Sequence, residues 1–182
     1  MTQTIVFLRA LNVGGKHIVK MAELRQHFAA MGFADAATYI QSGNVILQTK
    51  TADTAVLEQQ IEQHLQKILG YPVAAFARTT AEIQSILHNI PFPQSKLDAG
   101  AKLYIAFLKE RPDDEALTKL TPYQNEIDSF QFGDKELYWL CQKTQSQSKF
   151  SGSVLEKTVG CQATLRGLTT IQKIAAKYLS VT

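Results

Sequence analysis

Apolar residues along this sequence follow two alternating kinds of spacing, and together they predict the order of its secondary structure. Short β-branched or aliphatic runs bounded by Gly or Pro predict strands. Runs with an apolar residue every three or four positions predict amphipathic helices. In the N-terminal half the expected order is strand, helix, two strands, helix, strand, over residues 4–11, 21–31, 37–41, 45–49, 57–69 and 72–78.

The same order returns in the C-terminal half. Strands are expected over 103–108, 127–132, 137–141 and 162–166, with a short helix after Pro112 holding Leu117 and Leu120. A second helix carries Phe150 and ends at Gly160, and a last helix starts near residue 168. A βαββαβ order is the split-βαβ, ferredoxin-like unit. We therefore predict an α+β protein of two ferredoxin-like halves packed into one globule, plus a C-terminal helix, with the duplication resting on element order alone.

The boundaries between these halves follow from breaker residues. Thr79 and Glu82 have the spacing of a capping box, so a helix is expected to begin there. Pro91 and Pro93 end it, and residues 94–100 have the composition of a linker. The predicted organisation is a first half over 1–79, a connecting helix and linker over 80–100, and a second half with its C-terminal helix over 101–182.

Composition narrows the class of protein. With 45% hydrophobic residues the chain can bury a core, which excludes composition-driven disorder. The net charge of +3 permits an anionic partner, but the basic residues are scattered. The two cysteines, Cys141 and Cys161, exclude a disulfide framework and a cysteine-rich zinc site. The N-terminal apolar run, residues 5–8, is too short for a signal peptide or membrane span, so we expect a cytoplasmic protein with no membrane contact.

The Asn-Val-Gly-Gly-Lys segment at residues 12–16 allows two interpretations. A Gly-rich turn before a helix exposes backbone N–H groups to anions, which favours a phosphate-binding loop. It is not a Walker A motif, because Ala10 stands where the first glycine belongs and His17 replaces the magnesium-binding Ser or Thr. The alternative is a tight strand-to-helix turn that needs positive φ.

Other catalytic or metal-binding patterns are absent from the sequence. The histidines lack metal-ligand spacing, so no metal or other cofactor is expected. His27, His64 and His88 fall on amphipathic helices, where surface or boundary positions are typical, which leaves His17 as the histidine beside a candidate ligand. Both cysteines have apolar neighbours and are expected to be inert thiols.

Topology predicts where a site would form. In a ferredoxin-like sheet the end of the first strand and the turn between the second and third strands lie at the same edge. Polar and glycine residues of both turns should therefore meet, next to the start of the first helix. The alternative is that the amides only brace two neighbouring turns. The predicted ligand-binding residues are Arg9, Asn12, Gly14, Gly15, Lys16, Gln41, Ser42 and Asn44.

A second, weaker anion site is predicted near the C-terminal half. There Ser148 and Lys149 are expected to open a helix, and Arg166 is grouped with them.

The motifs as a set resemble a bacterial family, the domain of unknown function 1697. The resemblance rests on Leu8–Lys16, Met21–Arg25, Gly32–Phe33 and Tyr39–Val45, and extends through Pro91–Pro93, Tyr104–Leu108, Ser148–Lys149 and Thr164–Arg166. It implies a cytoplasmic α+β protein of paired ferredoxin-like subdomains and implies no activity. Near the C-terminus the family's Arg-Asn-Trp-Asn-Thr pattern is here Arg166-Gly-Leu-Thr-Thr170, so the amides and indole that could serve a ligand are missing.

These observations leave several functions open. The first is binding of an anionic or phosphorylated small ligand at the Gly-Gly-Lys turn. The second is a metal-independent enzyme acting on a phosphorylated substrate, with Lys16, Arg9 or His17 as electrophile or acid–base group. A nucleic-acid or protein-interaction module is the third, and nucleic-acid binding would weaken steeply with salt. The sequence does not decide whether the protein is an enzyme.

Overall fold

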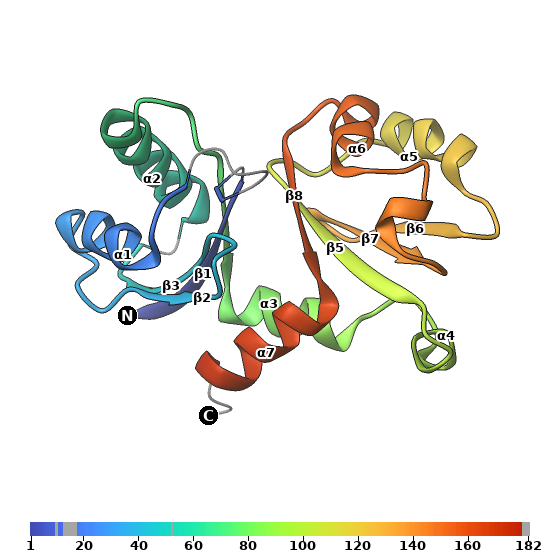
Figure 1. Cartoon of the computed structure of the whole chain (residues 1–182), viewed down its shortest axis with the longest axis horizontal. Coiled ribbons are helices and arrows are strands. Elements are labelled where there is room, and N and C mark those ends of the chain that lie inside the picture. Colours follow the sequence, from blue (N-terminus) through green and yellow to red (C-terminus); the bar gives the residue numbers. More distant parts are fainter. Residues whose placement is uncertain (10, 13–17, 52, 180–182) are drawn as a thin grey trace. The chain divides into compact units, whose positions relative to one another are not determined.

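The computed structural model describes the chain except for residues 10, 13–17, 52 and 180–182. The chain forms two compact units, one of residues 1–84 with 174–182 and the other of residues 85–173. Each contains a four-stranded antiparallel sheet (Figure 1). The α+β class, the two βαββαβ halves and the C-terminal helix are confirmed.

The first unit has the strand order β2-β3-β1-β4, which is the ferredoxin-like order. Strand β1 pairs antiparallel with both β3 and β4, so it lies in the middle of the sheet. The elements are β1 (Thr2–Leu8), α1 (Met21–Ala30), β2 (Ala37–Tyr39), β3 (Asn44–Thr49), α2 (Thr54–Leu69) and β4 (Ala75–Thr79).

The core of this unit lies between the sheet and its two helices, which cover the same face in Figure 1. Leu24 and Phe28 of α1 are fully buried, and so are Ile61 and Leu65 of α2. Asp53 caps α2 by accepting hydrogen bonds from the amides of residues 55 and 56. Ile68, which lies one turn further along the same apolar face of α2, is exposed.

The second unit repeats this arrangement with the order β6-β7-β5-β8. Its central strand β5 pairs antiparallel with β7 and β8. The elements are α4 (Gln94–Asp98), β5 (Lys102–Leu108), α5 (Asp114–Leu120), η1 (Thr121–Tyr123), β6 (Asp128–Phe132), β7 (Glu136–Cys141), η2 (Gln145–Gln147), α6 (Gly152–Val159) and β8 (Ala163–Gly167).

Aromatic rings form the centre of the second core. The Trp139 ring lies 5.1 Å from that of Phe150 and 6.4 Å from that of Phe130, with α5 and α6 contributing Leu120 and Leu155. Trp139 is fully buried, and its Nε1 donates to Asp128 Oδ1 at 2.8 Å. Trp139 therefore lies at the centre of this core.

Each sheet ends in a strand that passes directly into a helix. β4 continues into α3 (Thr80–His88), and β8 into α7 (Leu168–Tyr178). The capping box predicted at the first junction is present: Thr79 N donates to Glu82 Oε2 at 2.7 Å, and Glu82 N donates to Thr79 Oγ1 at 3.2 Å.

Two expectations about element limits are corrected. Residues 94–98, expected to be linker, form helix α4. The predicted helix around Phe150 begins only at Gly152, because Ser151 is its N-cap and accepts from the Val154 amide. The short helix expected after Pro112 is α5, in which Leu120 is buried and Leu117 is exposed.

Candidate functional site

The end of β1 and the β2–β3 turn lie together in the first unit, as the topology predicts. The Leu8 amide donates to the Gly43 carbonyl at 2.7 Å. Gly43 has a φ of +69°, and a Cβ at this position would lie 3.0 Å from Leu8 Cβ. The hairpin turn approaches the end of β1 so closely that a side chain at position 43 would crowd Leu8, in addition to the backbone strain of the positive φ.

Asn12 joins three parts of this edge through one side chain. Its Nδ2 donates to the carbonyls of Val19 at 3.1 Å and Gln41 at 3.2 Å, while its Oδ1 accepts from the Val19 amide at 2.8 Å. Asn12 also has a positive φ of 57°, a conformation that asparagine tolerates better than most residues. The side chain therefore holds both ends of the segment 12–19 and ties it to the neighbouring hairpin.

Asn44 and Ser42 brace the hairpin itself. Asn44 is completely buried, and its Nδ2 donates to the Tyr39 carbonyl at 3.0 Å and to Ser42 Oγ at 2.8 Å. Three of the predicted ligand-binding side chains, those of Asn12, Ser42 and Asn44, thus make hydrogen bonds within the turns. This is the bracing role that the sequence left open.

The other predicted residues differ in what the structure describes. Gln41 is exposed, and Arg9 is half-buried at the end of β1, where its amide donates to the Ala74 carbonyl at 2.8 Å. Gly14, Gly15 and Lys16 lie outside the described residues. The Gln41 side chain is therefore exposed at this edge.

The second predicted site is not assembled. Ser148 Oγ donates to Asp128 Oδ2 at 2.7 Å, next to edge strand β6. Arg166 lies on the opposite edge strand, β8, where its Nη1 donates to Thr164 Oγ1 at 2.8 Å. Strands β7 and β5 lie between β6 and β8, and Ser148–Lys149 do not open a helix, so the hydrogen bonds of Ser148 and Arg166 lie at different edges of the sheet. Burial lowers the Arg166 pKa to about 10, which leaves it charged at neutral pH.

The histidines on the helices and the two cysteines have the exposure expected from the sequence. His88 is exposed and His27 and His64 are half-buried, in agreement with surface or boundary positions. Both cysteines are free, and burial raises the pKa of the Cys141 and Cys161 thiols, which favours the unreactive protonated form. Within the described part of the chain, no three His, Cys, Asp or Glu side chains are grouped to hold a metal ion.

One cavity escaped the sequence reasoning altogether. It lies in the second unit, where α4, the start of β5 and the β8–α7 junction meet, and has a volume of about 290 Å³. Gln94 and Gln172 contribute to it from the two helices, and Tyr104 from β5. Residues 94–98 have the composition of a linker, and Tyr104 lies in an apolar strand, so no local pattern marks these residues as one site.

The fold is that of an α+β protein with two ferredoxin-like halves. In the first half, hydrogen bonds from Asn12 and Asn44 hold together the end of β1 and the β2–β3 turn, which we call the turn pair. A comparison with protein families matches residues 1–138 to the family described as "protein of unknown function (DUF1697)". The chain belongs to this family, as its motifs indicated. The altered segment Arg166–Thr170 lies beyond the matched residues.

A solved structure shares the fold over the whole length. It is that of a conserved bacterial protein from Streptococcus pneumoniae, with 21% identity, a TM-score of 0.80 and 99% of each chain covered. At this identity the likeness shows the fold alone. A search of curated proteins found no match. Among the described helices, none is both long and apolar enough to cross a bilayer.

Proposed function

We propose that the protein binds a small anionic ligand, such as a phosphorylated metabolite, at the edge formed by β1 and the β2–β3 turn. The observation that carries this proposal is the three-way hydrogen bonding of Asn12 with Val19 and Gln41. It fixes both ends of the glycine-containing segment before α1. Ligand sites need such positioned backbone, because ordering a loose loop on binding costs affinity.

Charge supports an anion as the ligand. Residues 8–20 contain three basic side chains, Arg9, Lys16 and Lys20, and no Asp or Glu. In this proposal Lys16, the Gly14 and Gly15 amides, Arg9 and Gln41 contact the ligand. Asn12, Ser42 and Asn44 position the two turns. The protein would act in the cytoplasm, which agrees with its two free thiols.

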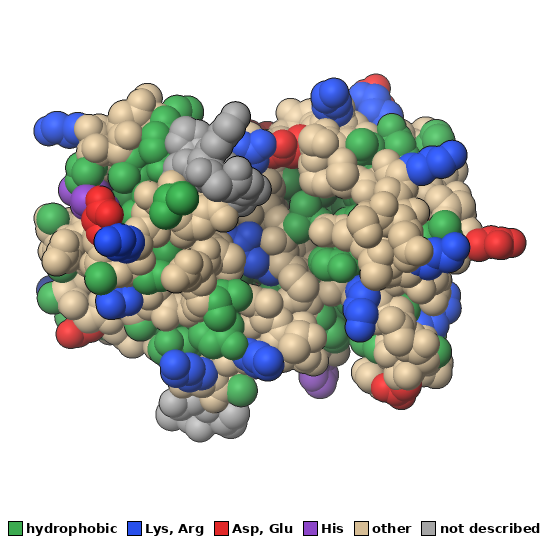
Figure 2. All heavy atoms as spheres, viewed as in Figure 1, with side chains coloured by type: hydrophobic (Ala, Val, Ile, Leu, Met, Phe, Trp, Pro, Cys, Tyr) green, Lys and Arg blue, Asp and Glu red, His purple; other side chains and the backbone are tan. Residues whose placement is uncertain are grey.

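A broad nucleic-acid interface receives less support. On the face drawn in Figure 2, the described Lys and Arg side chains are scattered among other residues and form no continuous basic patch. Nucleic-acid binding draws most of its affinity from many phosphate contacts. A compact ligand with one or two phosphates requires only the few basic groups near the turn pair.

The test is ligand-induced thermal stabilisation with inorganic phosphate, pyrophosphate, a sugar phosphate and a nucleotide as probes. A probe that binds the folded state at about a hundred times its dissociation constant stabilises it by about 2.7 kcal/mol. We expect Lys16→Ala to abolish the stabilisation. Lys67→Ala, which removes an exposed lysine on α2, should leave it intact.

Two results would contradict the proposal. One is a flat screen with all four probes. The other is equal stabilisation of Lys16→Ala and the parent protein. Stabilisation by an oligonucleotide alone, with a steep loss in added salt, would instead identify a nucleic-acid module.

A further inference from the structure

The cavity in the second unit borders an open stretch of strand edge. On one side β5 pairs with β7 from Lys102 to Phe107, whereas on the other side it pairs with β8 only from Tyr104 to Leu108. Strand β5 therefore extends two residues, Lys102 and Leu103, beyond the β8 ladder. Strand β8 ends at Gly167, and the chain continues from there into α7.

The N–H group of Leu103 faces the end of the β8 ladder. The Leu108 amide donates to the Lys135 carbonyl, on the β7 side of the strand. Because successive residues of an antiparallel strand turn their N–H and C=O groups to opposite edges, Leu103, five residues earlier, turns its own groups to the β8 side. Leu168 follows Gly167 and lies opposite Leu103, where its amide pairs with the Leu103 carbonyl. The Leu103 N–H points past the end of this ladder, and a ligand carbonyl there would accept from it.

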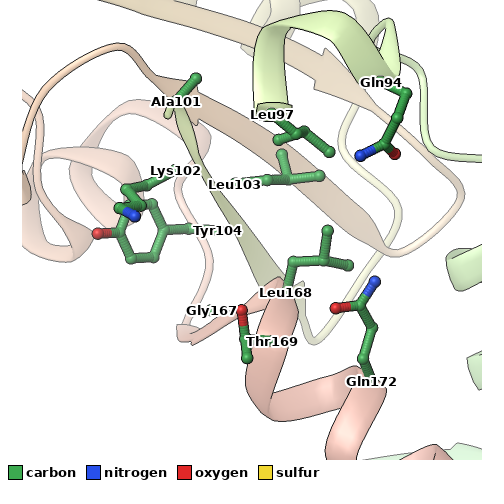
Figure 3. Close-up of a pocket in the computed structure, with 10 residues that line it drawn as sticks. All are labelled: Gln94, Leu97, Ala101, Lys102, Leu103, Tyr104, Gly167, Leu168, Thr169 and Gln172. Carbon is green, nitrogen blue, oxygen red and sulfur yellow. The ribbon is translucent and has the colours of Figure 1, made fainter. Parts of the chain in front are cut away.

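The cavity has different chemistry on the two sides of β5 (Figure 3). Leu103 lies on one side with Leu97 and Leu168, and the amides of Gln94 and Gln172 lie beyond the leucines. Lys102 and Tyr104 lie on the other side, as the alternation of a strand requires. An extended ligand also directs successive substituents to opposite sides, so an aliphatic group and a charged group would each meet a matching wall.

The charge and the volume of the cavity narrow the class of ligand further. Of the 10 residues that line the cavity, Lys102 is the one charged residue, and none is acidic. The volume of about 290 Å³ equals that of about ten water molecules in the liquid, which suits a ligand of about a dozen non-hydrogen atoms. We propose that the cavity binds an acylamino carboxylate, with its amide carbonyl at the Leu103 N–H, its aliphatic side chain among the leucines and its carboxylate at Lys102.

Gly167 offers a way to fill the cavity without disturbing the fold. It lines the cavity opposite Tyr104 in the β5–β8 ladder, and a Cβ added to it would meet no atom within 4 Å. Its φ lies outside the left-handed region, so a side chain causes no backbone strain. Gly167→Val should therefore fold and occlude the cavity. Gly167→Ala occupies less of the cavity and should weaken ligand binding less.

The test uses N-acetyl-L-leucine, its uncharged N-methylamide, and a ten-residue peptide ending in leucine with a free carboxylate. Binding to the full chain is followed by NMR, through the Leu103 and Gly167 amides and the Gln94 and Gln172 side-chain amides. We expect saturable shifts with N-acetyl-L-leucine and a dissociation constant on the order of 1 mM. The N-methylamide should bind about threefold more weakly, the scale of one exposed ion pair.

Variants then assign the contacts. Lys102→Gln should remove the preference for the carboxylate, whereas Lys96→Gln, an exposed lysine of α4 that does not line the cavity, should preserve it. Gly167→Val should weaken binding by at least about tenfold because its side chain occupies ligand space. Equal or tighter binding of the peptide identifies a polypeptide terminus as the source of the ligand, and binding of N-acetyl-L-leucine alone identifies a free metabolite.

Three results would overturn the inference. They are the absence of saturable shifts at these four residues with any carboxylate probe, equal affinity for the carboxylate and the N-methylamide, and unchanged affinity in folded Gly167→Val. Because the cavity lies in the second unit and the turn pair in the first, failure of this inference leaves the anion proposal standing.

Discussion

Arg166 occupies in the second sheet the position that Arg78 occupies in the first. Arg78 lies opposite Ile5 in the ladder of β4 with β1, and Arg166 lies opposite Ile105 in the ladder of β8 with β5. Each guanidinium donates from Nη1 to the carbonyl of the residue before it, at 2.9 Å and 2.8 Å. The two halves thus share side-chain detail in addition to the order of their elements.

A pair of glutamates repeats in the same way. Glu62 of α2 accepts from the Ala75 amide at the start of β4, and Glu156 of α6 accepts from the Ala163 amide at the start of β8, both at 2.8 Å. In each half a helix carboxylate therefore holds the first residue of the last strand. These matching contacts support the duplication that element order predicted.

Asn12 provides the first prediction. Asn12→Ala removes three hydrogen bonds and also places an alanine at a φ of 57°, so it should lower the free energy of unfolding by about 2–3 kcal/mol. Asn12→Gly loses the same bonds without the backbone strain and should cost about 1 kcal/mol less. Urea denaturation measures both.

The control for this prediction is Gln41→Ala. Asn12 bonds to the backbone carbonyl of Gln41, and the Gln41 side chain is exposed, so the substitution should change stability by less than about 0.5 kcal/mol. If Asn12→Ala is as stable as Gln41→Ala, Asn12 does not hold the segment.

Gly43 provides the second prediction, with a matched control in Gly32. Both have positive φ, +69° and +93°, so alanine costs backbone strain of about 1 kcal/mol at either position. Only at Gly43 would the new Cβ also meet Leu8, at 3.0 Å from its Cβ and 3.2 Å from its carbonyl oxygen. Gly43→Ala should therefore cost about 1–2 kcal/mol more than Gly32→Ala.

Comparison of Gly43→Ala with Gly32→Ala separates the cost of backbone strain from the cost of the contact with Leu8. Chemical denaturation under identical conditions gives the difference directly. Equal losses of stability in Gly43→Ala and Gly32→Ala would mean that the close approach of the hairpin to β1 relaxes at no cost.

The fold was largely predictable, because the local hydrophobic spacing and the turn residues agreed with it. The site was less predictable, since its contacts join residues that are far apart in the sequence. Asn12 reaches across 29 residues to Gln41, a partner that no spacing rule identifies. Helix α4 has five residues and a single leucine, Leu97, which is too short for periodicity to show. One available signal was overlooked: Ile5–Leu8 and Ile105–Leu108 hold equivalent ladder positions and match at three of four residues.

Asp128 provides the third prediction, which uses the single tryptophan of the chain as reporter. Asp128 is 2% exposed and accepts from Trp139 Nε1 through Oδ1 and from Ser148 Oγ through Oδ2. Asp128→Ala leaves the buried indole N–H without its acceptor and should cost about 1–3 kcal/mol. Asp128→Asn keeps one oxygen for Trp139, and the Ser148 hydroxyl can rotate to accept from the new amide, so the cost should be smaller.

Fluorescence and urea denaturation check the Asp128 prediction together. Asp128→Ala should shift the Trp139 emission and lower the denaturation midpoint, and Asp128→Asn should lie between it and the parent protein. Equal midpoints for all three proteins would show that Asp128 contributes nothing to this core.

Tyr138 provides the last prediction, a pH dependence of stability. Burial, and secondarily the nearby Glu136 carboxylate, raise the Tyr138 pKa from 10.0 to about 12. Its side chain packs in the second unit, where the hydroxyl donates to the Ile86 carbonyl at 3.5 Å. Above pH 10 the unfolded chain therefore loses this proton while the folded chain keeps it, so the folded state binds more protons and the free energy of unfolding falls as pH rises from 10 to about 12.

The control is Tyr138→Phe, which cannot ionise at this position. We expect the parent protein to lose about 1 kcal/mol more stability than Tyr138→Phe between neutral pH and about pH 11, since one pKa unit corresponds to about 1.4 kcal/mol. Tyr71 and Tyr104, whose pKa values burial also raises, are present in both proteins and cancel in the comparison. Urea denaturation at each pH measures the difference, and parallel stability curves for the two proteins would show that Tyr138 ionises as readily in the folded chain as in the unfolded one.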